Sequence, residues 1–239
     1  MKHACKLTAS LVALACASAP AAASAATIEL GGATTTAITT PTCPPGVPSA
    51  SCQLILTRTT GLETIRDSVA YPTTVTKSGV IVAWTVGLAS LSSSRTMRKQ
   101  YIHSLDASYG GTSEAAIVVL KSGRKRLFTV VTESPVEKLQ PYLGTVVQFP
   151  LATPIAVTRG EVIGLAVPTW APVLSYNLPT KKFAYRQSRI YNCKNPAAGQ
   201  TVQDTAKAAT RYECNYPGAR VEYRATEIPM PVPPKNYVR

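Results

Sequence analysis

Acidic residues and histidines are scarce in this chain, and each scarcity narrows the chemistry that the chain can perform. The 239 residues include 12 Asp and Glu against 25 Lys and Arg, with 2 His. Protein metal sites need clustered His, Cys or carboxylate ligands. The sequence has no HExxH motif, no acidic calcium loop and no His pair, so we expect no metal site and no cofactor.

Residue types for catalysis are also few. His103 is followed closely by Ser104 and Asp106, but triad members converge from separate elements, and neighbours this close on one segment point apart. There is no Gly-x-Ser-x-Gly elbow. Glu133 and Glu161 could face a common cleft as a carboxylate pair, although Glu161 is explained as well by a solvated turn. We therefore expect no catalytic residue, and keep a carboxylate-dependent hydrolase as an alternative.

Long hydrophobic runs are absent outside the first 25 residues. That segment has a basic start at Lys2 and Lys6, an apolar run over 7–17 and a small-residue cleavage site at 23–25. This pattern predicts a secretory signal peptide, a mature chain that begins at Ala26, and an extracytoplasmic or secreted location. No later segment is long enough to span a membrane after cleavage.

The charge balance favours anionic partners. Two of the basic residues and none of the acidic residues lie in the predicted signal, so the mature net charge is +11. Such a charge attracts envelope or extracellular polysaccharide and other polyanions, and nothing indicates specific recognition of nucleic acid. A basic but otherwise ordinary surface is the alternative, because most cations are scattered. The one dense cluster, predicted to be a solvated hairpin tip, comprises Lys121, Arg124, Lys125 and Arg126.

Four cysteines remain after the predicted cleavage, and they allow three pairings. Proximity favours Cys43 with Cys52 and Cys193 with Cys214. Export makes disulfides the default over metal ligation, and neither pair has zinc-knuckle spacing. We therefore expect two disulfides, each closing one loop.

Short strands dominate the pattern. Residues 154–168 are predicted to form a hairpin in a buried sheet, with Gly160 in the turn and Gly164 at a bulge or a close backbone approach. A second hairpin joins 115–121 to 127–132 through the basic cluster. Residues 61–70 are a short helix or turn candidate, and residues 202–210 could form a turn or two of helix. Further strands are predicted at 26–30, 53–57, 78–86, 145–149, 173–176, 182–187 and 221–226.

Such a strand pattern is typical of an all-β antiparallel β-sandwich or jelly roll, with long loops rich in Pro and Thr. An up-and-down barrel is the alternative. The predicted organisation is a signal peptide (1–25), an extended Thr/Pro-rich arm (26–52), one sandwich domain (53–228) and a Pro-rich tail (229–239).

The stretches 78–84, 117–120 and 154–165 together resemble a family of uncharacterised exported β-sandwich proteins from high-GC bacteria. The similarity spans about residues 78–167, under half of the chain. It implies the fold and no assigned activity. Many of those sequences have Asp after the turn glycine, where this chain has Glu161.

A binding surface is the remaining candidate site. Rings and cations in one Pro-rich region could present flat faces to a sugar and charge to an acidic group; the alternative is that the large rings belong to the core. The residues are Trp170, Tyr176, Lys182, Tyr185 and Arg186, with Phe183 and Lys181 beside them.

The sequence therefore favours a secreted, non-enzymatic sandwich that binds an envelope or extracellular polymer. The two alternatives are the hydrolase above and a structural cell-surface subunit. The oligomeric state is left open.

Overall fold

A computed structural model of the chain describes residues 26–32, 37–46, 54–190, 193 and 201–230. This part of the chain is mostly β, every strand pairing in it is antiparallel, and its α-helix is α1 (Arg95–Tyr109). The predicted all-β antiparallel class is confirmed at that level. The strands are β1 (Ile28–Leu30), β2 (Leu56–Arg66), β3 (Val69–Ala70), β4 (Gly79–Gly87), β5 (Glu114–Ser122), β6 (Leu127–Glu133), β7 (Glu137–Lys138), β8 (Val146–Val157), β9 (Val162–Ala171), β10 (Leu174–Ser175), β11 (Phe183–Gln187), β12 (Ala209–Arg211), β13 (Cys214–Pro217), β14 (Arg220–Val221) and β15 (Tyr223–Pro229).

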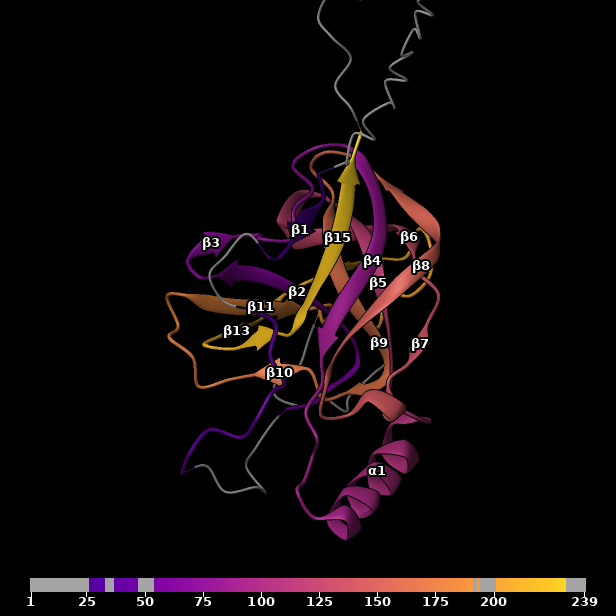
Figure 1. Cartoon of the computed structure of the whole chain (residues 1–239). Coiled ribbons are helices and arrows are strands. Elements are labelled where there is room, and N and C mark those ends of the chain that lie inside the picture. Colours follow the sequence, from indigo (N-terminus) through magenta and orange to yellow (C-terminus); the bar gives the residue numbers. More distant parts are fainter. Residues whose placement is uncertain (1–25, 33–36, 47–53, 191–192, 194–200, 231–239) are drawn as a thin grey trace, which may run out of the picture.

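Two large sheets share the main hydrophobic core. One has the order β1-β15-β4-β8, and the other has the order β12-β6-β5-β9-β2-β11-β13, with β3 and β7 attached to it (Figure 1). Trp84 of β4, Ile117 of β5 and Leu165 of β9 are fully buried in this core. Alternation along each strand turns these residues inward, because successive side chains of a strand point to opposite faces.

The larger sheet curls into a half-barrel. Its two end strands, β12 and β13, are joined directly by Tyr212 and Glu213. A second core fills the concave side, where Phe128 and Tyr212 pack edge to face with ring centroids 4.9 Å apart. Gln203 covers this core from the 201–208 segment and donates to the carbonyls of Phe128 (3.1 Å) and Ala208 (2.9 Å).

The predicted hairpin at 154–168 is wrong in one respect. Both strands exist, and Gly160 has the positive φ (93°) expected of the turn. However, β8 pairs with β4, while β9 lies between β2 and β5, so the turn connects two sheets. Both edges of β9 are occupied and none is left for β8. The close approach at Gly164 is confirmed, because an added Cβ there would lie 3.0 Å from Leu120 Cδ1.

The helix predictions fail. Of the two alternatives at 61–70, the turn is present at Asp67 and Ser68, between the end of β2 and β3, and the helix is not; residues 202–210 contain no helix. The helix that forms, α1, projects from one end of the sheets (Figure 1) and has no buried residue, so it leaves little hydrophobic periodicity in the sequence. Its ends do carry standard signals: the Ser94 side chain accepts from the Met97 amide, and Gly110 ends it with φ 87°.

Two other sequence predictions can be compared with the structure. The hairpin of β5 and β6 is confirmed, and so is the disulfide between Cys193 and Cys214. The pairing of Cys43 with Cys52 and the tail beyond Met230 involve residues outside the described ranges. No described helix has the length and apolar character needed to cross a membrane.

Candidate functional site

The tip of the β5–β6 hairpin is a tight turn made of cations. The Leu127 amide donates to the carbonyl of Arg124, and the two residues between them both have left-handed backbones: Lys125 with φ 54° and ψ 43°, and Arg126 with φ 60°. The Gly123 amide closes the turn by donating to the Leu127 carbonyl at 2.7 Å. Positive φ at both central residues is the geometry of a type I′ hairpin turn.

Lysine and arginine are unfavourable in this geometry. A Cβ in the left-handed region crowds the following carbonyl, and Asn, Asp and Gly are the residues that tolerate it. The turn between β2 and β3 has the same positive φ at two adjacent residues, Asp67 (50°) and Ser68 (71°), and uses Asp there. The cationic turn therefore stores backbone strain that an ordinary residue choice would avoid.

Tyr212 brings a cation from another strand to this turn. Its amide donates to the Arg126 carbonyl at 3.0 Å. Arg186 of β11 donates from Nη1 to the carbonyls of Tyr212 and Glu213, each at 3.1 Å. Partial burial lowers the pKa of Arg186, and the positive charge of Arg126 lowers it further. Tyr212 thus connects Arg126 and Arg186 although sixty positions separate them.

We call this cluster the basic tip. Arg211 belongs to it because Arg211 lies opposite Leu127 in the β12–β6 ladder. Its ion pair with Glu213 is 3.8 Å long and both side chains are partly exposed, so it neutralises little. No other ion pair reaches the cluster within the described ranges. The basic tip consists of Lys121, Arg124, Lys125, Arg126, Arg186 and Arg211.

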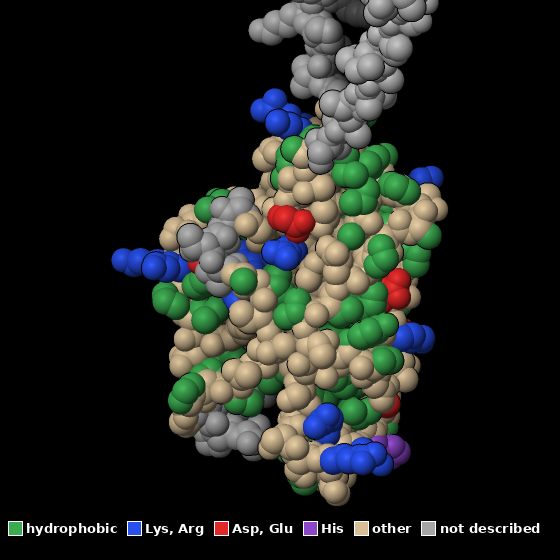
Figure 2. All heavy atoms as spheres, in the orientation of Figure 1, with side chains coloured by type: hydrophobic (Ala, Val, Ile, Leu, Met, Phe, Trp, Pro, Cys, Tyr) green, Lys and Arg blue, Asp and Glu red, His purple; other side chains and the backbone are tan. Residues whose placement is uncertain are grey.

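The remaining cations are more dispersed where they can be compared. On the face drawn in Figure 2, most Lys and Arg side chains stand apart, separated by apolar and neutral surface. The His and some of the basic side chains visible at its lower end lie in the region of α1. Clustering at the basic tip is therefore a local feature and does not simply follow from a basic composition.

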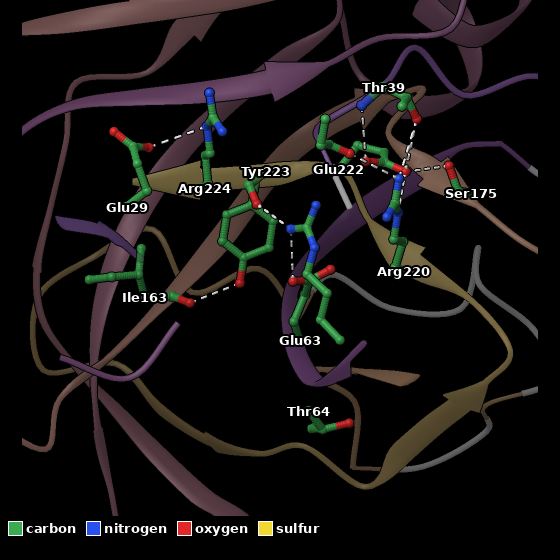
Figure 3. Close-up of polar contacts among 12 residues, drawn as sticks. Glu29, Thr39, Glu63, Thr64, Ile163, Ser175, Arg220, Glu222, Tyr223 and Arg224 are labelled. Carbon is green, nitrogen blue, oxygen red and sulfur yellow. Dashed lines mark hydrogen bonds and ion pairs between the residues drawn. The ribbon is translucent and has the colours of Figure 1, made fainter. Parts of the chain in front are cut away.

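A second group of charges is buried (Figure 3). Arg66 Nη1 lies 3.3 Å from Glu63 Oε2 and donates to the Tyr223 carbonyl at 3.2 Å. Glu222 accepts from Arg220 Nε and from the Ser175 hydroxyl, both at 2.5 Å, and from the Thr39 amide at 3.3 Å. This network connects the N-terminal arm to β2, β10 and the β14–β15 segment.

Burial changes the pKa of one carboxylate in this network. Burial raises the pKa of Glu63 to about 8, against the opposing charge of Arg66, and the nearby Glu222 raises it further. One protonated and one ionised carboxylate is the set that glycoside hydrolysis requires. However, the side chains of Glu63 and Glu222 have no exposed surface, so no glycan can reach them. The sequence indicated neither, because the contacts that bury them join distant strands.

The carboxylates considered from sequence do not form a pair either. Glu161 Oε2 accepts from the Thr158 amide at 2.7 Å, which makes it part of the turn between β8 and β9. Glu133 ends β6 opposite Val118. No contact joins Glu133 to Glu161 among the described residues.

The His103 segment is part of helix α1, and its three candidate side chains have different surroundings. His103 is exposed on α1, Ser104 lines a hollow, and Asp106 Oδ1 accepts from Trp170 Nε1 at 2.9 Å. Ser104 is one position from His103 and two positions from Asp106, and side chains at these spacings on a helix do not face each other. The three side chains therefore do not converge.

The predicted aromatic and basic set is divided by the fold. Trp170 has no exposed surface and donates to Asp106 and to the Gly111 carbonyl (3.0 Å); Tyr185 is 2% exposed and stacks on Tyr216. These two rings belong to the interior, in keeping with the alternative interpretation. Tyr176 is half-buried, Lys182 is exposed, and Arg186 joins the basic tip.

One apolar hollow lies beside α1. It has a volume of about 190 Å³, and its wall includes Leu54, Ile55, Leu91, Tyr101 and Leu105. Leu91 has a left-handed backbone, with φ 65°. None of the described residues that line this hollow is charged. It is therefore suited to apolar contact and not to the anionic partners that the composition favours.

Comparison with known proteins identifies no relative: no family model, no curated protein and no solved structure matches the chain. Within the described ranges, no group of three or more His, Cys, Asp or Glu residues is placed to hold a metal ion. The similarity to uncharacterised exported proteins stays a prediction.

Proposed function

We propose that the protein is a secreted, non-enzymatic β-sandwich of the jelly-roll kind that binds an anionic polymer of the cell envelope or the extracellular space. The basic tip is its binding surface. The observation that carries this proposal is the turn at Lys125 and Arg126, where two cations occupy left-handed backbone positions.

Strain of this kind costs about 1–3 kcal/mol per residue and is found most often at functional sites, where the surrounding structure maintains it. No hydrogen bond or ion pair joins the side chain of Lys125 or Arg126 to the described part of the chain and would repay this cost. A contact with an external partner would supply a reason to keep them.

The electrostatics point to the same partner. Six cations share the basic tip with one weakly paired acid, Glu213, so each adds to a local positive potential. An anionic polymer relieves this repulsion along several residues at once and releases its own counterions. A neutral polymer gains neither effect.

A hydrolase is less well supported. The carboxylates of Glu63 and Glu222 are fully buried and paired with arginines. A structural cell-surface subunit that assembles by pairing strand edges is less well supported too. The edge strand β8 contains Pro150 and Pro154, and prolines on an edge discourage pairing with another chain.

The test uses the purified mature chain and three polymers of matched length: polygalacturonate, polyphosphate and neutral dextran. We expect both anionic polymers to bind, with an association constant that falls steeply as NaCl rises from 50 to 300 mM. Dextran should not bind. If neither anionic polymer binds at 50 mM NaCl, the proposed function is wrong.

A further inference from the structure

Arg186 is held in place before any ligand arrives. Its Nη1 donates to two backbone carbonyls, and its side chain is half-buried. A guanidinium has five N–H donors in a planar fork. Nε and Nη2 of Arg186 donate to no residue in the described ranges, so this part of the fork is available to an external acceptor.

Tyr71 is an exposed ring on a fixed backbone near this guanidinium. Its φ is 46°, its amide donates to the Thr64 carbonyl at 2.9 Å, and its own carbonyl accepts from the amide (3.0 Å) and hydroxyl (2.8 Å) of Thr74. The side chain is 40% exposed. A ring whose backbone is already ordered loses little conformational entropy when it binds.

Hydrogen bonds place the Tyr71 backbone beside the strand that carries Arg186. Thr64, which accepts from the Tyr71 amide, donates from its hydroxyl to the Ala184 carbonyl at 3.2 Å, and Ala184 lies two residues before Arg186 on β11. Tyr212 in turn connects Arg186 to the Arg126 carbonyl. The pKa of Arg186, lowered first by burial and then by Arg126, is shifted in the opposite direction by Tyr71, in keeping with this arrangement.

This combination suits one class of anion best. A carboxylate fits the planar fork of arginine with two parallel hydrogen bonds. The apolar C–H face of a sugar ring packs on a tyrosine ring, whose polar hydroxyl stays in water. A polyphosphate has the charge and lacks the apolar face, so it would leave Tyr71 unused.

We propose that Arg126, Arg186 and Tyr71 form a subsite for a carboxylated sugar, in which the guanidiniums hold the carboxylate and the ring carries the sugar face. This inference rests on the proposed function and narrows its polymer to a uronate-type acidic polysaccharide. The same three residues would select that polymer over phosphate-bearing ones.

The test compares polygalacturonate with polyphosphate at equal charge concentration, using the full mature chain. We expect Tyr71→Ala to weaken polygalacturonate binding about tenfold and to change polyphosphate binding less than twofold. Tyr71→Phe keeps the ring and should bind like the wild type. Arg186→Lys keeps the charge, lacks the planar fork, and should also weaken polygalacturonate binding selectively.

The outcomes separate the two proposals. If both polymers bind and neither Tyr71→Ala nor Arg186→Lys distinguishes them, the sugar subsite is wrong and the polyanion function stands. If neither polymer binds to the wild type, both proposals are wrong. Unchanged circular dichroism of each variant confirms that a lost affinity reflects lost contacts.

Discussion

The turn at the basic tip makes a prediction that separates binding from folding. In the double variant Lys125→Asn/Arg126→Gly, both residues become types that accept positive φ. The left-handed backbone costs about 1–2 kcal/mol per L-residue, whereas the glycine adds about 0.5–1 kcal/mol of chain entropy to the unfolded state. We expect a net gain of about 1–2 kcal/mol in the free energy of unfolding.

That gain should be visible as a higher melting temperature. For a domain of this size, 1 kcal/mol shifts Tm by about 2–4 °C, so the variant should melt about 2–8 °C above the wild type. Binding should change in the opposite direction. Each cation near an anionic surface contributes about 1 kcal/mol, so losing two should weaken binding to polygalacturonate about 30-fold and flatten its dependence on salt.

The matched control removes the same charge elsewhere. Arg95 and Lys99 are exposed on α1, which packs near Trp170, at the opposite end of β9 from the basic tip. Arg95→Gln/Lys99→Gln should leave binding within about threefold of the wild type. Calorimetry and titrations on all three proteins check the reasoning. A tip variant that melts lower than the wild type, or that binds polygalacturonate equally well, would refute it.

Three further predictions concern the fold. The folded-state pKa of Glu63, about 8, lies above its unfolded value of 4.5, so its contribution to stability is complete below pH 4.5 and is lost as the pH rises through 8. The Tm of the wild type should therefore fall between pH 5 and pH 9, in part because Glu63 ionises. In Glu63→Gln that part of the fall should be absent, and parallel curves of Tm against pH for the two proteins would contradict this. Opening the Cys193–Cys214 disulfide, whose cysteines are 21 positions apart, should cost about 3 kcal/mol in urea unfolding; an unchanged midpoint under reduction would exclude that role. Trp170→Phe leaves the Asp106 carboxylate and the Gly111 carbonyl without their shared donor, which should cost about 1–3 kcal/mol and speed hydrogen exchange in α1; unchanged exchange would show that α1 is held by other contacts.

The fold was predictable where neighbouring segments pair. The β5–β6 hairpin and the Cys193–Cys214 disulfide both follow from residues close in the chain. The pairing of β8 and β9 was not predictable from adjacency, because both edges of β9 are taken by strands from other parts of the sequence. Helix α1 was missed because it buries no residue, and only the capping signals at Ser94 and Gly110 could have indicated it.

The candidate site was predictable in part. The cations of the hairpin tip form a visible cluster in the sequence, and Arg186 stood out among the candidate binding residues. The sequence does not show that Arg186 joins the cations of the hairpin tip. That grouping depends on the curl of the larger sheet, which brings Tyr212 against both Arg126 and Arg186. Neither the strained turn nor the role of Tyr71 has any signal in composition, since both follow from backbone angles.

Local chemistry along the chain determined the strand-rich class, the cationic turn and the second disulfide, because alternation, turn residues and short loops act over a few positions. Tertiary structure decided which strands share an edge, that Trp170 and Tyr185 lie inside, and that a cation of β11 meets the hairpin tip. These outcomes depend on contacts between residues far apart in sequence. Each such contact is favourable only if the surfaces that it joins are still uncovered when the other strands have paired.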